Sequence, residues 1–330
     1  MSMTPQSGLT LVSRDASGVD LAFRADVLTG LAQPQKAVPA RWFYDDAGSR
    51  LFEDITQLPE YYLTRAETAI LTARGAEFAA LVGAGRAVVE FGSGSSIKTP
   101  LLLSAIAPAA YVPLDIAGDF LRASALDLAQ KFPGLPVYPV EADFMRRVAL
   151  PPEVADLPKL GFFPGSTIGN MVAATAVDLL RSMRTTLGTG AQLLIGLDLI
   201  KDTDSLIAAY DDASGVTAAF NRNLAVRINS EIGGTLPLDR LRHEARWNAD
   251  HARIEMHLVA TSAFAFEVGE AQFTMAAGES IHTENSHKFT PESANLLLLA
   301  GGWEPLARWS DEARQFALLL AEARPPRSAP

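Results

Sequence analysis

Short apolar runs alternate with helix-compatible segments through the middle of the chain. The runs end at Glu90, Asp115 and Asp143, near Pro164 and at Ile200, and most are apolar at consecutive positions. Consecutive apolar positions indicate strands that are buried on both faces, and alternation with helices is typical of a parallel sheet covered on each side. The helices are predicted over residues 64–82, 120–131 and 173–187.

The pattern changes after residue 200. Residues 202–223 look helical, whereas residues 228–288 alternate between apolar and polar positions with a period of two, which predicts antiparallel strands. A helix is expected again from Thr290, and the two apolar segments that follow it could complete the first sheet. The chain therefore leaves an α/β domain and later returns to it. The predicted domains are residues 62–200 plus 288–330, and residues 1–61 plus 201–287.

The N-terminal part contains further predicted helices. One covers residues 20–31, and another begins at Thr64, where Glu67 lies three residues on and would complete a capping box. The chain ends, up to about Val19 and over the final RPPRSAP, are expected to be loose.

Composition narrows the class of protein. The net charge of −10 and the lack of a Lys/Arg cluster argue against a nucleic-acid partner. The chain has no cysteine, which excludes disulfides, thiolate metal sites and a cysteine nucleophile. Its apolar stretches are strand-sized and no signal peptide is visible, so we expect a cytoplasmic protein without a membrane partner.

The run VVEFGSGSS, residues 88–96, joins a strand that carries Glu90 to a glycine turn with Gly92 and Gly94. Strand, glycine turn and helix in this order are typical of a nucleotide-binding crossover. A dinucleotide fingerprint requires a third glycine where Ile97 stands, and a phosphate loop requires a glycine at the same position, before Lys98. An acid followed by Gly-x-Gly better fits a site for S-adenosylmethionine (SAM), although a purely structural turn remains an alternative.

Other polar residues follow the predicted strands. A carboxylate at Asp115 suits the two hydroxyls of a ribose, and Asp143 with Phe144 suits an adenine ring. Asn170, in the run STIGNM, offers a donor and an acceptor that could orient a nitrogen nucleophile. Each also has a structural interpretation, as a loop residue or helix cap.

A metal site is the alternative interpretation of His282 and His287, which flank Glu284. Their spacing matches no common zinc-binding helix, and no cysteine is available. We therefore predict no metal, and we expect the other histidines to be polar or packing residues.

Several segments together resemble one family. FYDDAGSRLFEDITQLPEYYLTRAE, EFGSGSSIKT, PLDI, EADF, FFPGSTIGN and ESIHTENSHKF are similar to the histidine-specific SAM-dependent methyltransferases, from about Phe23 to the C-terminal strands. The resemblance implies a class I, Rossmann-like doubly wound sheet with a second α+β substrate domain, formed by the N-terminal segment and an insertion. It implies SAM contacts at Gly92, Lys98, Asp115, Asp143 and Phe144.

The same resemblance implies a set of substrate residues. Tyr44 and Asn170 would act on the substrate's amino group as the catalytic pair. The other implied substrate residues are Phe52, Tyr61, Gly165 and Tyr210, with Met256, Glu284 and Ser286 beside the imidazole. A carboxylate and a hydroxyl can read the two nitrogens of an imidazole, and losing such a match costs about 1–3 kcal/mol.

The activity implied is methylation of the α-amino group of L-histidine, up to the trimethylated betaine hercynine, as the first step of ergothioneine synthesis. We expect a monomer that acts on a small molecule. The alternatives are an N-methyltransferase of another aromatic amino acid or amine, and a non-catalytic SAM-binding module.

Overall fold

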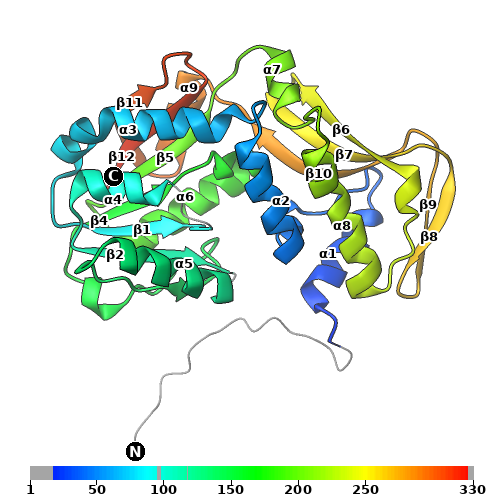
Figure 1. Ribbon diagram of the computed structural model, residues 1–330, viewed down its shortest axis with the longest axis horizontal. Coiled ribbons are helices and arrows are strands. Elements are labelled where there is room, and N and C mark those ends of the chain that lie inside the picture. The colour runs from blue at the N-terminus through cyan, green and yellow to red at the C-terminus, as the bar shows by residue number, and fades with distance from the viewer. Residues whose placement is uncertain (1–17, 95–97, 117, 326–330) are drawn as a thin grey trace, which may run out of the picture. The chain divides into compact units, whose positions relative to one another are not determined.

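The computed structural model describes residues 18–94, 98–116 and 118–325, and the chain divides into two compact units (Figure 1). Unit 1 contains the described residues up to Glu60, together with Asp204–Asn248 and Ile254–Asn285. Unit 2 contains Tyr61–Thr203, Ala249–Arg253 and the described residues from Ser286 onward. The predicted loose chain ends lie almost wholly outside the described residues.

Unit 2 is built on a seven-stranded sheet with the order β11-β12-β5-β4-β1-β2-β3. β1 pairs in parallel with both β2 and β4, and β4 pairs in parallel with β5, whereas β11 and β12 run antiparallel at one side. The strands are β1 (Ala87–Phe91), β2 (Ala110–Asp115), β3 (Val140–Glu141), β4 (Lys159–Phe163), β5 (Gln192–Asp198), β11 (Trp303–Ser310) and β12 (Phe316–Ala323). The predicted α/β fold class is confirmed, including the return of the chain to complete this sheet.

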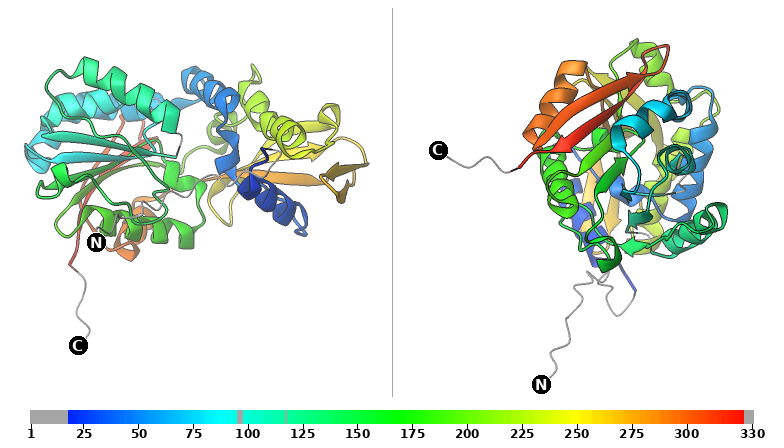
Figure 2. Two further views of the ribbon diagram at one scale, coloured as in Figure 1. Left: turned by 90° about the horizontal axis from the view of Figure 1, so that it is seen from below. Right: turned by 90° about the vertical axis from the view of Figure 1, so that its left-hand side faces the viewer.

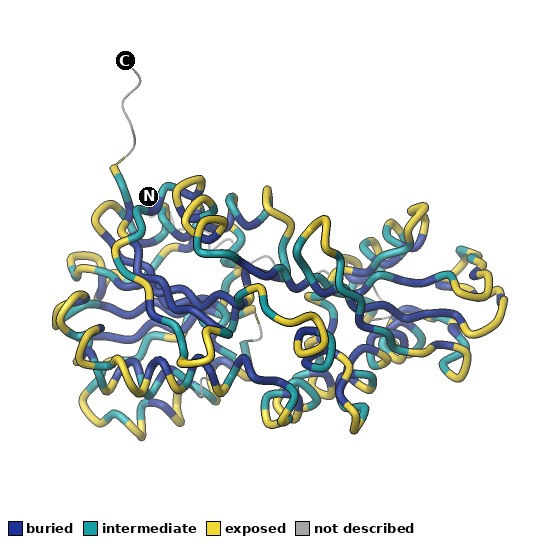
Figure 3. Tube along the Cα trace, turned by 90° about the horizontal axis from the view of Figure 1, so that it is seen from above, coloured by how far each residue is buried: buried dark blue, intermediate teal, exposed yellow. Residues whose placement is uncertain are grey.

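Helices cover both faces of the sheet (Figure 2). α3 and α4 pack together on one face, and α6 and α9 pack together on the other. Every residue of β5 is buried, and the central strands are dark blue in Figure 3. The helices of unit 2 are α3 (Tyr62–Val82), α4 (Thr99–Ile106), α5 (Gly118–Lys131), α6 (Ala173–Leu187) and α9 (Pro291–Ala300), with the 3-10 turns η2 (Pro152–Val154) and η3 (Thr167–Asn170).

Unit 1 combines helices with two small sheets, a three-stranded one with the order β10-β7-β6 and the hairpin β8-β9. α2 and α8 pack against each other beside the first sheet. The helical elements are α1 (Leu21–Leu31), η1 (Ala40–Phe43), α2 (Asp46–Gln57), α7 (Thr203–Ala208), α8 (Val216–Ile232) and η4 (Leu238–Arg240). The strands are β6 (Leu241–Asn248), β7 (Arg253–Ala260), β8 (Phe264–Val268), β9 (Ala271–Met275) and β10 (Ser280–His287).

The single helix predicted over residues 202–223 is wrong. The structure forms two helices, α7 and α8, and α8 continues to Ile232, which was assigned to the alternating region. Gly215 has a φ of 77°, and the Asp212 carboxylate accepts hydrogen bonds from the backbone N–H groups of Val216 and Thr217. This carboxylate satisfies the first donors of α8, so a new helix begins where the sequence suggested continuation.

Among the described residues, no helix has both the length and the hydropathy that crossing a membrane requires.

Candidate functional site

The glycine turn and Asp115 meet at the carboxyl edge of the sheet. Gly92 and Gly94, directly after β1, have φ values of 72° and 44°, which a side chain would make costly. The Gly94 N–H donates to the Asp115 carboxylate over 3.2 Å, and the Gly92 N–H donates to the Leu114 carbonyl over 2.9 Å. The two predicted ligand-binding features are therefore neighbours. Ile97, which weakened the alternative nucleotide motifs, lies outside the described residues.

The Phe144 ring lies against this turn. A Cβ atom on Gly92 would approach it to 3.5 Å, and the ring stands edge-on to Phe91 and Phe163 at centroid distances of 6.1 and 6.2 Å. Asp143 is exposed, and its Oδ1 accepts a hydrogen bond from the Met145 N–H over 3.0 Å. β3 therefore ends at Glu141 and not at Asp143 as predicted, because Asp143 takes part in a turn.

Lys98 is held by a carboxylate that the sequence analysis assigned to another role. Its Nζ lies 2.5 Å from Oε2 of Glu67, which is fully buried, and Glu67 also accepts a hydrogen bond from the Gly165 N–H over 2.9 Å. The capping box predicted at Thr64 is wrong, because α3 begins at Tyr62 and Glu67 points into the unit. Glu67 thus joins the helix after the glycine turn to the loop after β4.

Glu90, the acid of the glycine motif, is also buried. Thr99 and Tyr111 donate hydrogen bonds to its carboxylate, while burial raises its pKa to about 7. The carboxyl group is therefore split between its protonated and ionised forms near neutral pH. It anchors the first turn of α4 beneath the glycine turn.

The loop that carries Asn170 is tightly constrained. Ser166 has a φ of 59°, and a Cβ on Gly169 would lie 2.9 Å from the carbonyl oxygen of His287. The His287 ring, whose pKa burial lowers, bonds through Nδ1 to the Gly169 carbonyl over 2.8 Å. Because a carbonyl only accepts, Nδ1 carries the proton. His287 therefore fixes the backbone just before Asn170, the last residue of η3.

Two further predicted substrate residues lie in unit 2 and are buried. Tyr61 directly precedes α3, and Ser286 stands in β10 with its Oγ 2.8 Å from Nζ of Lys288. Gly165, whose N–H is held by Glu67, has a φ of 80°. The structure thus fixes the backbone or side chain of each of these three positions.

The remaining predicted substrate residues belong to unit 1, where three aromatic rings form a cluster. The Tyr44 ring stands edge-on to the rings of Phe52 and Phe220, with centroid distances of 5.7 and 5.8 Å. The centroids of the Phe52 and Phe220 rings are 6.0 Å apart. Phe220 was missed by the sequence analysis. Its place on α8 next to the aromatic N-terminal segment depends on a long-range contact, and a lone phenylalanine on a helix is ordinary core composition.

Burial and neighbouring groups shift the pKa of the Tyr44 hydroxyl. Desolvation, followed by the negative charge of Glu284 and by electrostatic coupling to the Tyr210 phenol, raises the pKa of Tyr44 well above its usual value, although 43% of the residue is exposed. Tyr44 is therefore a neutral phenol at physiological pH, able to accept or donate a hydrogen bond. Tyr44, Tyr210 and Glu284 all belong to unit 1.

A buried histidine supports Tyr210. The His243 Nε2 atom lies 2.8 Å from the Tyr210 carbonyl, and its Nδ1 lies 2.8 Å from the side-chain amide nitrogen of Asn221. Burial lowers the pKa of His243, so its Nδ1 accepts from the amide and its Nε2–H donates to the carbonyl. Asn221 also accepts from Thr283, whose hydroxyl lies 3.0 Å from the carbonyl of Met256. This network ties Tyr210 to β10 and to Met256.

Glu255, His257 and His282 form a group that could be taken for a metal site, because their ligand atoms lie within 4.8 Å of one another. The two imidazoles are stacked, with centroids 4.8 Å apart and an interplanar angle of 20°. Imidazole lone pairs lie in the ring plane, so two nearly parallel rings do not direct theirs at one ion. His257 also bonds to Ser280 and Glu255. We therefore retain the prediction of no metal.

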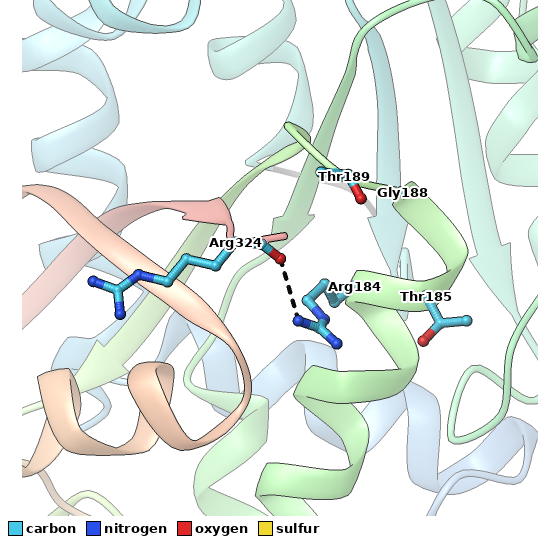
Figure 4. A pocket seen from close by; sticks show the side chains of 5 residues that line it. All are labelled: Arg184, Thr185, Gly188, Thr189 and Arg324. Carbon is cyan, nitrogen blue, oxygen red and sulfur yellow. Dashed lines mark hydrogen bonds between the residues drawn. The ribbon is translucent and has the colours of Figure 1, made fainter. Parts of the chain in front are cut away.

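A cavity of about 210 Å³ lies at the other end of β5, where Gly188 and Thr189 precede the strand (Figure 4). Arg184 donates a hydrogen bond across it to the Arg324 carbonyl over 3.2 Å. None of its lining residues belongs to the predicted site, which lies at the carboxyl ends of the strands. The cavity is therefore not the candidate site.

Comparison with known proteins places this arrangement in a family. A family model described as histidine-specific methyltransferase, SAM-dependent, matches residues 23–323. The chain belongs to this family. A histidine N-alpha-methyltransferase from Mycolicibacterium smegmatis is 42% identical over 91% of the chain and 94% of that protein. The protein of the same name from Mycobacterium tuberculosis is 41% identical over 91% of the chain and 95% of that protein. Ergothioneine biosynthesis protein 1 from Neurospora crassa is 29% identical over 90% of the chain, which corresponds to 35% of that longer protein.

Membership makes SAM the methyl donor, and the described residues fit it. The donor site of a SAM-dependent enzyme needs a close backbone approach and an acid for the ribose, and Gly92, Gly94 and Asp115 are the residues that would supply them. The Phe144 ring beside the turn offers a flat apolar surface for an adenine. The SAM-dependent methyltransferase that the sequence predicted is confirmed.

Proposed function

We propose that this enzyme transfers methyl groups from SAM to the α-amino group of L-histidine, three times in succession, to give hercynine. This reaction would be the first step of ergothioneine synthesis. The observation that carries the proposal is the acid at position 284 acting on Tyr44 within an aromatic cluster, in a chain 42% identical to a histidine N-alpha-methyltransferase. An imidazole needs a polar partner in an otherwise aromatic wall, and Glu284 provides one.

The methyl donor supplies an electrophilic methyl carbon on a sulfonium, whose leaving group is a neutral thioether that needs no acid. The protein must bind the amine in its neutral form and aim its lone pair. An α-amino group at a chain terminus has a pKa of roughly 8, so a proton is lost before each transfer. Tyr44 stays protonated and would orient the amine by a hydrogen bond, with Asn170 as its partner. Catalysis would rest on positioning.

Glu284 and Ser286 would read the substrate's ring. Glu284 accepts a hydrogen bond from one ring N–H, and Ser286 offers its hydroxyl to the other ring nitrogen. Phe52 and Tyr61 would supply apolar walls, Met256 would lie beside the ring, and Tyr210 would bind near the carboxylate. Phenylalanine, whose ring has no N–H, would leave Glu284 without its partner, which costs about 1–3 kcal/mol.

The aromatic cluster also favours the second candidate, N-methylation of another aromatic amino acid or amine, since Tyr44, Phe52 and Phe220 suit any flat ring. Incubation with SAM and equimolar histidine, tryptophan and tyrosine, followed by mass spectrometry, separates the two. We expect histidine alone to gain methyl groups, with the trimethylated form as the final product. Methylation of tryptophan or tyrosine in preference would support the alternative, and no transfer to histidine would exclude the proposal.

The proposal includes a monomer acting in the cytoplasm on a small molecule. Its support is the net charge of −10, because repulsion between like-charged chains disfavours self-association. Light scattering of the purified enzyme, with and without SAM, tests the monomer, and fractionation of the producing cell tests the location. A stable dimer or a membrane-associated pool would contradict it.

A further inference from the structure

A chain of buried polar side chains runs through unit 1 and joins elements that carry proposed substrate residues. Its members are Thr283 on β10, Asn221 on α8 and His243 on β6. Asn221 is 0% exposed, Thr283 is 1% exposed, and the His243 side chain is 2% exposed. Thr283 precedes Glu284, and Asn221 follows Phe220 of the aromatic cluster. A buried network whose polar atoms are hydrogen-bonded fixes one arrangement of the elements that it joins.

The hydrogen bonds of this chain have one direction. The Asn221 side-chain nitrogen lies 3.0 Å from the His257 carbonyl, which can only accept, so the amide oxygen faces the Thr283 hydroxyl over 2.7 Å. The same nitrogen lies 2.8 Å from Nδ1 of His243, which therefore accepts. Nε2 then carries the proton of the neutral ring and donates to the Tyr210 carbonyl over 2.8 Å.

An ion pair with Asp211 is the alternative role for His243. The Asp211 carboxylate lies 3.8 Å from Nε2, outside hydrogen-bond distance, and its side chain is 44% exposed. Burial lowers the pKa of the imidazole, which favours the neutral ring. A neutral ring accounts for the contacts of both nitrogens, so the partner of Nε2 is the main chain of Tyr210.

Tyr210 stands in the connection between two helices, since α7 ends before it and α8 begins after it. Its N–H donates to the Ile207 carbonyl over 2.9 Å, and its carbonyl accepts from His243. Because both backbone groups are held, the direction of the Tyr210 side chain is set as well. The phenol is coupled electrostatically to the Tyr44 hydroxyl, so a shift of this main chain would move a group that belongs to the proposed substrate site.

We propose that His243 is a positioning residue that holds the main chain of Tyr210, and with it the phenol, in the conformation that binds the substrate near its carboxylate. Asn221 sets the imidazole tautomer that this contact requires. The inference rests on the proposed function. It adds a determinant of histidine binding that acts through another residue.

The two nitrogens of His243 can be tested separately. A glutamine amide extends about as far as Nε2 of a histidine, and an asparagine amide extends about as far as Nδ1. His243→Gln therefore keeps a donor for the Tyr210 carbonyl and loses the acceptor for Asn221, whereas His243→Asn keeps that acceptor and loses the donor. Each variant removes the ring and one buried hydrogen bond, and only His243→Asn releases Tyr210.

Steady-state kinetics of wild type and the two variants measures the difference. We expect His243→Asn to raise the KM for histidine about tenfold, the size of one lost hydrogen bond. Its kcat and its KM for SAM should stay within about twofold of wild type, because a contact made equally in the ground and transition states changes KM alone. His243→Gln should keep the KM for histidine within about twofold.

Two further variants separate positioning from general destabilisation. His257→Asn removes another buried imidazole of unit 1, whose described ring contacts are with Ser280, Glu255 and His282. It should lower the melting temperature and leave the KM for histidine unchanged. In a Tyr210→Phe background, His243→Asn should raise the KM for histidine no further, because both changes act through one phenol.

Equal KM values for histidine in His243→Asn and His243→Gln, or additive effects of His243→Asn and Tyr210→Phe, would overturn the inference. If His243→Asn does not fold, nitrogen-15 NMR of the wild-type enzyme with labelled histidine side chains is the second measurement. The signal that disappears in His243→Gln should show a protonated Nε2 and an unprotonated Nδ1, and it should shift when unlabelled histidine is added. A protonated Nδ1, or a signal that histidine does not move, contradicts the role.

The outcome for wild type separates this inference from the proposed function. A wild-type enzyme that methylates histidine while His243→Asn and His243→Gln behave alike rejects only the role of His243. A wild-type enzyme that transfers nothing to histidine rejects the proposed function together with this inference.

Discussion

Glu284 acts electrostatically on the Tyr44 hydroxyl within unit 1, so an acid stands beside the aromatic cluster. If it accepts the ring N–H of histidine, Glu284→Ala should weaken histidine binding about tenfold or more, corresponding to 1–3 kcal/mol. Binding of phenylalanine should stay equal or improve, because its ring leaves no acceptor unsatisfied. Calorimetric titration with both amino acids measures the change. Glu267→Ala, at an exposed acid of β8, is the control, and unchanged histidine affinity in Glu284→Ala would refute the imidazole role.

Tyr44 gives a prediction about pH. Its raised pKa keeps the phenol protonated, so the rise of kcat/KM with pH should report the substrate's amino group, which must lose its proton. Tyr44→Phe should lower kcat about tenfold, through a lost orienting hydrogen bond, and leave the rising limb at the same pH. Measuring kcat/KM against pH for the wild type and for Tyr44→Phe shows whether the rising limb lies at the same pH in both. If the rising limb disappears or moves to another pH in Tyr44→Phe, Tyr44 itself is the base that removes the proton from the amino group.

The residues of the candidate site were predictable where a local motif carries them. Gly94 follows β1 and Asp115 ends β2 at the sheet edge, and the structure joins them by a hydrogen bond. Glu67 was assigned to a helix cap because a Thr-x-x-Glu spacing is a local signal, whereas its contacts with Lys98 and Gly165 bridge distant parts of the sequence. Buried ion pairs of this kind leave no periodic trace in a sequence.

At the scale of elements, Glu67 links α3, the start of α4 and the loop after β4. Glu67→Gln keeps the shape and a hydrogen-bond acceptor for Gly165, yet leaves the largely buried Lys98 ammonium without its counter-charge. We expect a loss of about 3 kcal/mol in unfolding free energy and a higher KM for SAM. Urea denaturation and kinetics measure both.

The matched control is Glu77→Gln, on the same helix, whose carboxylate pairs with the exposed Arg74 and accepts a hydrogen bond from the Trp309 indole that a glutamine oxygen can keep. It should leave the KM for SAM unchanged and cost little stability. A Glu67→Gln enzyme with normal stability and normal KM for SAM would mean that Lys98 does not depend on Glu67.

The elements themselves were predicted well where periodicity was continuous. Helix α6 has the predicted bounds, and β5 and β12 occupy the predicted apolar segments. The errors lie where a single side chain or glycine starts a new element, as at Asp212 and Gly215 before α8. A carboxylate that caps a new helix competes with continuation of the preceding helix. The amino-acid composition of the segment alone does not decide whether one helix or two will form.

At the scale of the whole molecule, each unit is assembled from segments that are far apart in sequence, so its stability depends on buried polar groups that fix long-range contacts. In two of these groups, burial shifts the pKa in opposite directions. Burial lowers the pKa of His257 from 6.5 to about 4, and burial raises the pKa of Glu90 from 4.5 to about 7. Each shift links stability to pH with its own sign.

Neutral His257 contributes stability that is fully present above pH 6.5 and is lost as the pH falls toward 4. Protonated Glu90 contributes stability that is fully present below pH 4.5 and is lost as the pH rises through 7. The two trends oppose each other between pH 4.5 and 6.5, and each is on the order of 3 kcal/mol.

We therefore expect wild-type unfolding free energy to change little across this interval. His257→Gln should become less stable as the pH rises, because only the Glu90 trend remains, and Glu90→Gln should become more stable. Denaturant titrations at pH 5 and pH 7 measure the slopes, and parallel slopes in the two variants would show that neither group controls the pH dependence.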